Sequence, residues 1–303
     1  MHIYLPVAVL STSFLLVVAV GVMVGFLSGL VGVGGGFLLT PILMMIGVPP
    51  TIAAASGTCA LVGTSSSATA AHFRLGHVDL KLGTILLLGG LAGAAIGVRV
   101  IKALRALGNA DLVIIITYVV VLGSVGTFMF LESLQTLRRG ALPPKPSHRV
   151  RRGSFLSKLP LQMNFPRSNV SHPVFVPFLL CALVGILAAV MGVGGGFIMV
   201  PMMVYLLRMP MHVAVGTDLF QIVFTCAGIT LMQAATNFTV DVVLAILVAV
   251  GSTVGAQIGA RLSRVLRGEQ LRIVLASVVL ATTVKMAIAL LLEPENLLTR
   301  AAS

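Results

Sequence analysis

Charged residues are scarce in this chain of 303 residues: they make up 9% of it, and eight residues are acidic. Soluble domains carry roughly 25% charged residues, so the composition excludes an ordinary soluble enzyme. The hydrophobic fraction is 58% and the mean hydropathy is +1.10. Several apolar stretches reach the roughly 20 residues that a bilayer-spanning helix needs. The composition predicts a multi-pass protein of the inner (plasma) membrane.

Cysteines are also few, and Cys59, Cys181 and Cys226 all lie inside apolar runs. Such thiols behave as small buried hydrophobic groups, so we expect neither a disulfide nor a metal site. No motif indicates a cofactor. The first residues contain no Lys or Arg, whereas a cleaved signal peptide normally begins with positive charge. We therefore expect the first apolar run to be a retained helix.

Acidic residues are absent between Ser133 and Ser171, where the sequence is rich in proline and basic residues. The basic residues in or beside this stretch are Arg138, Arg139, Lys145, Arg149, Arg151, Arg152, Lys158 and Arg167. An excess of Lys and Arg is typical of a cytoplasmic loop, which can also contact anionic lipid headgroups. Because this loop carries much of the net charge of +12, we expect no nucleic-acid partner.

The sequences on either side of this loop repeat each other. Residues 32–37 and 192–197 both read Gly-Val-Gly-Gly-Gly-Phe, and a proline follows four residues after each Phe. Residues 93–99 match 255–261 at nearly the same spacing, so one unit of about 120 residues occurs twice. The chain is therefore divided into an N-terminal transmembrane repeat at 1–130, a basic, Pro-rich cytoplasmic linker at 131–172 and a C-terminal transmembrane repeat at 173–303.

The apolar runs that begin at the glycine motifs are too short to cross a membrane. Residues 35–47 would cover about 20 Å of a hydrocarbon layer of about 30 Å, and residues 195–208 are similar. We expect broken or half-length helices at these Gly-rich turns, with the freed backbone groups facing protein or a wet cavity.

The behaviour of the chain at the glycine motifs decides the topology. If it turns back, each half makes an odd number of passes and the halves are inverted; if it only kinks, they are parallel. The positions of the basic residues favour inversion when the linker is cytoplasmic. The prediction is an all-α integral membrane protein with two inverted-topology repeats and about 8–10 membrane segments.

The glycine motifs are the first candidate for a substrate-binding site. Glycine lets backbone N–H groups approach a ligand, and the helix that follows attracts anions at its N-terminus. Two such ends could hold one oxyanion near the membrane midplane. The alternative is close helix packing, which we assign to the other regularly spaced glycines. The candidates are Gly34, Gly35, Gly36, Gly194, Gly195 and Gly196.

The second candidate group comes from two segments, 51–72 and 211–236, that are unusually polar for membrane helices. Asp218, Gln221 and Thr225 share one helical face, and Thr58 and Ser65 are matched positions in the first half. Their hydroxyl and amide groups can donate to an anion; the alternative is hydrogen bonding between helices.

Asp218 is also a candidate for proton coupling, because an acid inside a membrane is costly and usually functional. The alternative is a charge at a helix start that the helix dipole stabilises. His72, His77 and His212 flank segment ends, where we expect them at the membrane interface, and His72 has no obvious partner. A catalytic pair of Ser56 and His72 would be separated by about 24 Å on one helix, so we expect no catalytic residues and no enzyme.

The duplicated glycine motif, the short helix after it and the stretch Ala-Val-Gly-Thr-Asp-Leu-Phe at 214–220 resemble the TauE/SafE (sulfite exporter) family of membrane permeases. The resemblance implies two inverted halves and a central site beside the glycine turns. It also implies transport of a small sulfur-containing anion, such as sulfite or a sulfonate. We therefore expect a secondary transporter for a small anion, with coupling to protons as an additional hypothesis. The alternatives are an anion channel and a transporter of a small anion without sulfur.

Overall fold

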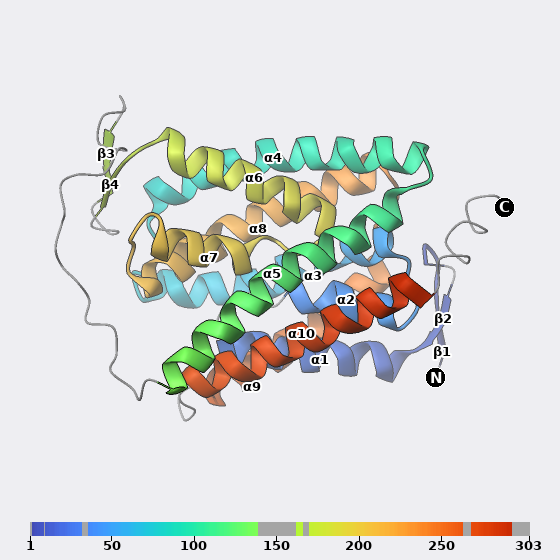
Figure 1. Ribbon diagram of the computed structural model, residues 1–303. Helices are drawn as coiled ribbons and strands as arrows, with labels where there is room; N and C mark the ends of the chain where they lie inside the picture. The colour runs from blue at the N-terminus through green and yellow to red at the C-terminus, as the bar shows by residue number, and fades with distance from the viewer. Residues whose placement is uncertain are drawn as a thin grey trace.

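The computed structural model describes residues 2–8, 10–31, 36–138, 162–165, 170–262 and 268–292. These residues form a helical bundle with a short antiparallel hairpin near either end (Figure 1). The first half contains β1 (His2–Leu5), β2 (Leu10–Ser13), α1 (Phe14–Val31), α2 (Gly36–Met45), α3 (Pro50–Arg74), α4 (Leu80–Ala106) and α5 (Ala110–Arg138). The second half contains β3 (Gln162–Phe165), β4 (Val170–Pro173), α6 (Phe175–Met191), α7 (Gly196–Tyr205), α8 (Met211–Thr236), α9 (Val242–Leu262) and α10 (Gly268–Leu292).

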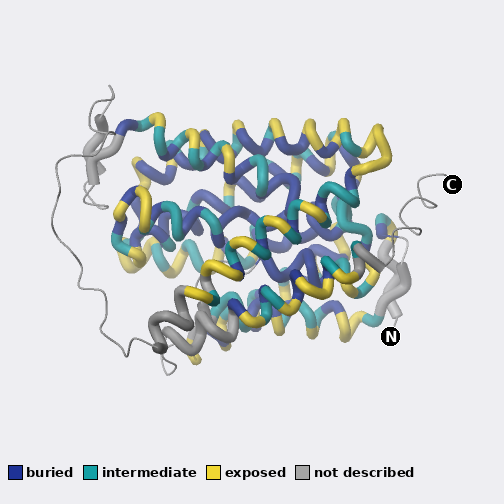
Figure 2. The backbone as a smooth tube through the Cα atoms, viewed as in Figure 1, coloured by how far each residue is buried: buried dark blue, intermediate teal, exposed yellow. Residues whose placement is uncertain are grey.

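The predicted all-α membrane fold is confirmed. Within the residues that the structure describes, four helices are long and apolar enough to cross a membrane: α4, the first part of α5, α8 and most of α9. Shorter apolar helices accompany them, including the ten-residue α2 and α7. Figure 2 shows a buried interior and many exposed residues on the outer faces of the helices. Large apolar side chains such as Leu88, Leu183 and Ile246 are exposed there, as expected for a surface that contacts lipid.

Local sequence signals explain where the long helices begin. α3 begins at Pro50, since proline is well suited to the first position of a helix, and α8 begins directly after Pro210. α4 and α9 start after aspartates: an Asp79 carboxylate oxygen accepts from Leu82 N at 3.2 Å, and an Asp241 carboxylate oxygen accepts from Leu244 N at 3.1 Å. Both aspartates are N-caps, which satisfy backbone donors that the helix leaves free.

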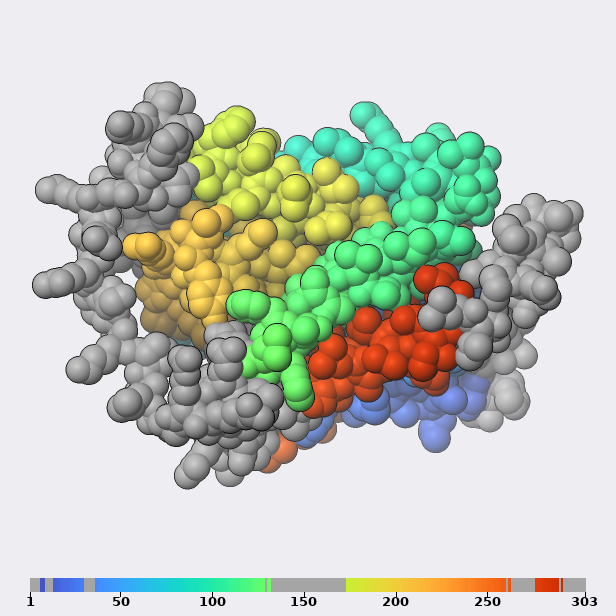
Figure 3. All heavy atoms as spheres, in the orientation of Figure 1, coloured from blue at the N-terminus to red at the C-terminus, as the bar shows by residue number. Residues whose placement is uncertain are grey.

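The two halves interlock, because most helices of one half pack on helices of the other. α1 packs along α9 and α6 packs along α4, while α3 pairs with α8 and α5 pairs with α10. Small residues permit these close approaches: Gly25 lies against Ser252 of α9, and Gly93 lies against the Ala182 backbone of α6. Figure 3 shows α5 lying between α10 and the pair α6 and α7 on one face of the molecule.

The order of these contacts fixes the running directions of the helices. Gly21, Gly25 and Gly29 meet successively later residues of α9, so α1 and α9 are parallel. Successive glycines of α4 likewise meet successively later residues of α6. In contrast, α3 and α8 are antiparallel, since Thr58 lies at Thr230 while Leu61 packs on the earlier Cys226.

The ends of the bundle can be named from the ends of the helices. α1 begins and α10 ends at one end, which we call the terminal end (Figure 1). α5 ends and α6 begins at the opposite end, which we call the linker end. Because α4 is parallel to α6, α3 ends and α4 begins at the linker end, and α8, antiparallel to α3, begins there as well.

Candidate functional site

The second glycine motif breaks the chain between α6 and α7. Gly192, Gly194 and Gly195 have φ angles of 75°, 73° and 84°, a region that residues with a Cβ atom rarely adopt. Gly192 ends α6, and its N–H donates to Ala188 O at 2.8 Å. Gly196 then begins α7, with the Gly195 carbonyl accepting from the amide of residue 199 at 2.9 Å. The predicted break is therefore present in this half.

After the break, the chain turns back. Gly194 lies against Ile222 and Cys226, and the residues at the end of α7 pack with Val213 near the start of α8. α7 therefore runs opposite to α8 and to α6. At 1.5 Å per residue its ten residues cover about 15 Å, which is about half of the hydrocarbon layer.

In the first half, Gly34 and Gly35 lie outside the described residues, and Gly36 begins α2. α2 also runs opposite to the helix that follows it, because Gly36 contacts Leu61 while the later Thr40 lies at Gly57 of α3. α2 and α7 are therefore matched half-length helices. Each ends close to the end of the bundle at which the helix before it, α1 or α6, begins.

The first turns of α2 and α7 meet inside the bundle. The rings of Phe37 and Phe197 have their centroids 5.5 Å apart. Leu61 links the same two regions, since it contacts Gly36 and lies 3.2 Å from the position that a Cβ atom on Gly194 would occupy. The Tyr118 hydroxyl donates to the Met191 carbonyl at the end of α6. The N-terminal ends of the two half-length helices thus converge.

This convergence concentrates backbone donors. The first N–H groups of any helix have no acceptor within that helix, and no side chain caps the start of α7. The aligned peptide dipoles add partial positive charge at each start. Two such ends close together form a suitable environment for an anion.

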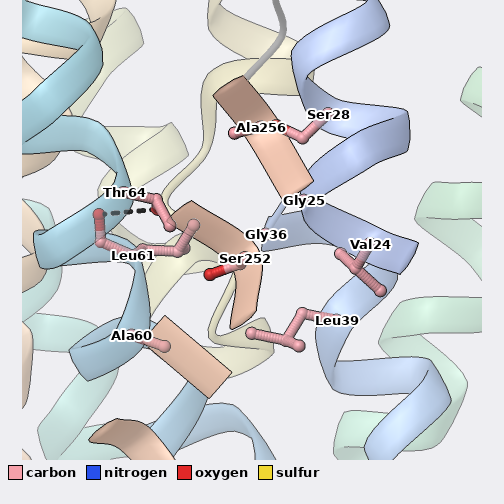
Figure 4. A pocket seen from close by; sticks show the side chains of 10 residues that line it. All are labelled: Val24, Gly25, Ser28, Gly36, Leu39, Ala60, Leu61, Thr64, Ser252 and Ala256. Carbon is pink, nitrogen blue, oxygen red and sulfur yellow. Dashed lines mark hydrogen bonds between the residues drawn. The ribbon is translucent and has the colours of Figure 1, made fainter. Parts of the chain in front are cut away.

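A small cavity lies beside the start of α2, at the junction of α1, α2, α3 and α9 (Figure 4). Its volume is about 20 Å³, which is room for about one water molecule. Ser28, Thr64 and Ser252 contribute hydroxyl-bearing side chains to a mainly apolar lining. Sequence reasoning did not select Ser28 or Ser252; the signal available for Ser252 was its match to Gly90 at the spacing that relates α4 to α9.

The polar face of α8 is buried in the second half. The Gln221 side-chain amide donates to the Thr225 hydroxyl at 2.8 Å. Gly90 of α4 lies directly against this pair: a Cβ atom there would lie 2.7 Å from Gln221 Nε2 and 2.9 Å from Thr225 Oγ1. Gly90 therefore makes room for the two polar side chains, which the structure brings together as predicted from their spacing.

Asp218 lies one turn before Gln221 on the same helix and is 2% exposed. It is the eighth residue of α8, and one carboxylate oxygen has no hydrogen-bond partner among the described residues. Such a position is too deep for a simple helix-start charge, because the dipole effect falls off within the first turn. Asp218 is thus a buried acid that the described contacts leave incompletely satisfied.

Thr58 and Ser65 are buried on α3. The Thr58 hydroxyl donates to Ala55 O at 2.7 Å and accepts from Thr230 at 3.5 Å. Hydrogen bonding within and between helices, the alternative weighed above, therefore accounts for Thr58 in this state of the protein. Among the described residues, no group of three or more His, Cys, Asp or Glu side chains is arranged to hold a metal ion.

A family model described as Sulfite exporter TauE/SafE matches residues 17–286. The chain belongs to the TauE/SafE sulfite exporter family.

Curated relatives agree with this assignment. A probable membrane transporter protein of Bacillus subtilis, YunE, is 30% identical over 69% of this chain and 73% of its own length. A second one, YjnA, is 26% identical over 89% of this chain and 98% of its own length. Sulfite exporter TauE/SafE family protein 3 of Arabidopsis thaliana is 30% identical over 38% of this chain and 26% of its own length. No solved structure matches the chain.

Proposed function

We propose that this TauE/SafE protein is a secondary transporter that moves a small sulfur-containing anion, sulfite or an organic sulfonate, across the inner (plasma) membrane. The observation that carries the proposal is the meeting of α2 and α7 at Phe37 and Phe197. Two half-length helices that point their N-termini at a shared interior region supply backbone donors for the oxygens of one oxyanion. The names of the family and of the Arabidopsis relative support sulfite chemistry.

We further propose that the two halves are inverted repeats that rock against each other. Support comes from the antiparallel pairing of α3 with α8, which occupy matched places in the two halves. The linker end would face the cytoplasm, because the basic residues of 131–172 lie between α5 and α6. The same basic residues would contact anionic headgroups of that leaflet.

The cavity at α2 holds about one water molecule, so the described state leaves no room for an oxyanion beside Gly36. Opening of the region between the two halves would be needed to admit substrate. The described, closed state would be an occluded stage of an alternating-access cycle. Asp218 would take up and release the coupled proton.

The test is transport in proteoliposomes with sulfite, sulfoacetate and thiosulfate, with acetate and nitrate as anions without sulfur. We expect saturable uptake and counterflow for at least one sulfur-containing anion. Gly194→Ala places a methyl group against Cys226 and should abolish uptake, whereas Gly47→Ala, also at positive φ but with open space around it, should not. Uptake that neither saturates nor shows counterflow would indicate a channel, and uptake limited to acetate or nitrate would reject the sulfur specificity.

A further inference from the structure

Buried polar atoms without partners gather along one strip between α3 and α8. Asp218 Oδ1, Thr69 Oγ1, His72 Nδ1 and His77 Nδ1 are four of the six such side-chain atoms in the part of the chain that the structure describes. An unsatisfied buried polar group costs roughly 1–3 kcal/mol, and proteins usually satisfy it with internal water. Four of them along one path indicate a place where water or a transferable proton resides.

Three of the histidines lie together at the linker end of this strip. The ring centroids of His72 and His77 are 5.7 Å apart, and those of His77 and His212 are 4.9 Å apart. The backbone N–H of His77 donates to the backbone carbonyl of His72 at 3.0 Å. This hydrogen bond fixes the short connection after α3. His212 is exposed, whereas His72 and His77 are half-buried. The cluster therefore reaches from the surface into the bundle.

The packing of α3 on α8 continues the strip inward. Leu61 packs on Cys226 and Thr58 lies at Thr230. The same antiparallel register places Thr69 level with Asp218. His72 lies one helical turn nearer the linker end, since it follows Thr69 by three residues.

The start of α8 joins the histidines to the acid. The His77 carbonyl lies 2.6 Å from the place that a Cβ atom on Gly216 would occupy, so the connection after α3 packs directly on α8. Gly216 precedes Asp218 by two residues, and His212 precedes Asp218 by six, or about 9 Å along the helix.

The other charged and titratable groups on the surrounding elements leave Asp218 as the buried group that would accept the proton. Arg74, Lys81 and Arg208 are exposed on α3, α4 and the connection before α8. Asp79 is buried, but its carboxylate caps α4 through Leu82 N and its own N–H donates to the Thr217 hydroxyl. Further titratable groups are the thiols of Cys181 on α6 and Cys226 on α8, both buried, and the phenol of Tyr205 on α7.

We propose that His72, His77 and His212 form the proton path between the linker end and Asp218, with Thr69 and internal water completing it. The inference deepens the proposed function and rests on its proton coupling. Imidazole suits this role because its two nitrogens can accept one proton while releasing another near neutral pH. A proton taken from water by His212 passes through His77 and His72, and each imidazole returns to its neutral form. Water beside Thr69 then delivers the proton to the Asp218 carboxylate, and release follows the reverse order.

The test separates net proton-driven transport from counterflow, which exchanges substrate without requiring net proton movement. In proteoliposomes of the full chain driven by a pH gradient, we expect His77→Gln to slow sulfite transport at least about tenfold. Counterflow at equal pH should stay within about twofold of wild type, which also shows that the variant folds. Imidazole added on the linker side should restore part of the lost rate. His2→Gln, in β1 at the terminal end, is the matched control and should leave both rates unchanged.

A second variant tests the buried part of the path. Thr69→Val removes one unpartnered hydroxyl with little change in shape, and Thr239→Val makes the same change at an unpartnered hydroxyl outside the strip. We expect slower proton-driven transport in the first variant alone. Wild-type proton-driven rates in both His77→Gln and Thr69→Val would overturn the proton path.

Asp218→Asn distinguishes the two levels of the hypothesis. If this variant loses the response to a pH gradient while the histidine and threonine variants keep it, the path is wrong and the coupling role of Asp218 stands. If Asp218→Asn keeps the response, the coupling role and the path both fail. A wild-type protein that moves none of the sulfur-containing anions would reject the proposed substrate class instead.

Discussion

Around α2, a small cavity is lined by Ser28 and Thr64 of the first half and Ser252 of the second, whereas Gln221 and Thr225 fill the matched region near α7. The differences occur at paired positions of the repeat: Leu61 corresponds to Gln221, Ser252 to Gly90 and Thr58 to Asp218. The backbone plan is therefore shared, but the acid and the amide occur in the second half and the empty space in the first. A duplicated fold can keep its symmetry while its chemistry becomes one-sided.

The largest expected effect concerns the glycine motif between α6 and α7. Gly192→Ala forces a side chain into positive φ and against the backbone of Ala54. Gly76→Ala, at a φ of 71° compared with 75° for Gly192, has open space around it and pays only the backbone cost. We expect Gly192→Ala to lose about 1–3 kcal/mol more stability than Gly76→Ala. Thermal unfolding in detergent measures the difference, and equal losses would show that close packing at this turn is unimportant.

The next effect tests whether Asp218, the acid that is present in the second half alone of the two matched positions, couples transport to protons. Asp218→Asn should make transport of sulfite independent of an imposed pH gradient and lower the gradient-driven rate at least about tenfold. Thr58→Val, at the matched position, should change the rate by less than about threefold, because the Thr58 hydroxyl is already bonded to Ala55 O. The measurement is initial uptake over a series of pH gradients. Comparable losses in the two variants would mean that the halves share the coupling role.

A smaller effect is expected at the amide. Gln221→Leu installs the residue found at the matched position 61 and leaves the Thr225 hydroxyl without its donor. The variant would also lose the proposed hydrogen bond from the Gln221 amide to the substrate. At about 1 kcal/mol, the loss of that bond should raise the KM for sulfite about fivefold. Gln257→Leu, at an exposed position of α9, serves as the control and should leave KM unchanged. An unchanged KM in both variants would remove Gln221 from the binding site.

The smallest effects concern two hydrogen bonds that join the halves at opposite ends of the bundle. The Asp79 N–H donates to the Thr217 hydroxyl at 3.0 Å, and the Asp241 N–H donates to the Ser56 hydroxyl at 2.9 Å. Thr217→Ala and Ser56→Ala should each lower the free energy of unfolding by about 1 kcal/mol. Thermal unfolding of both variants provides the measurement. A clearly larger loss in one would show that the two ends are held with unequal strength.

Several parts of the candidate site could be predicted from the sequence because they depend on local chemistry. The break at residues 192–195 follows from glycines that can adopt positive φ, and the N-caps Asp79 and Asp241 follow from their place before apolar runs. The pairing of Gln221 with Thr225 follows from helical periodicity. Contacts between distant segments have no such signal: neither the position of Leu61 between Gly36 and Gly194 nor the ring neighbours of His72 could be found from spacing along the chain.

The sequence by itself determined that the chain is a helical membrane protein, built from a unit that occurs twice and is interrupted at its glycines. Composition and residue periodicity carry that information, because lipid excludes unpaired backbone groups and favours continuous apolar helices. The tertiary structure alone decided that α2 and α7 meet at Phe37 and Phe197, that each half packs on the other, and that the rings of three histidines lie next to one another. These relations depend on the angles and depths at which helices pack, which are set by side chains far apart in the sequence.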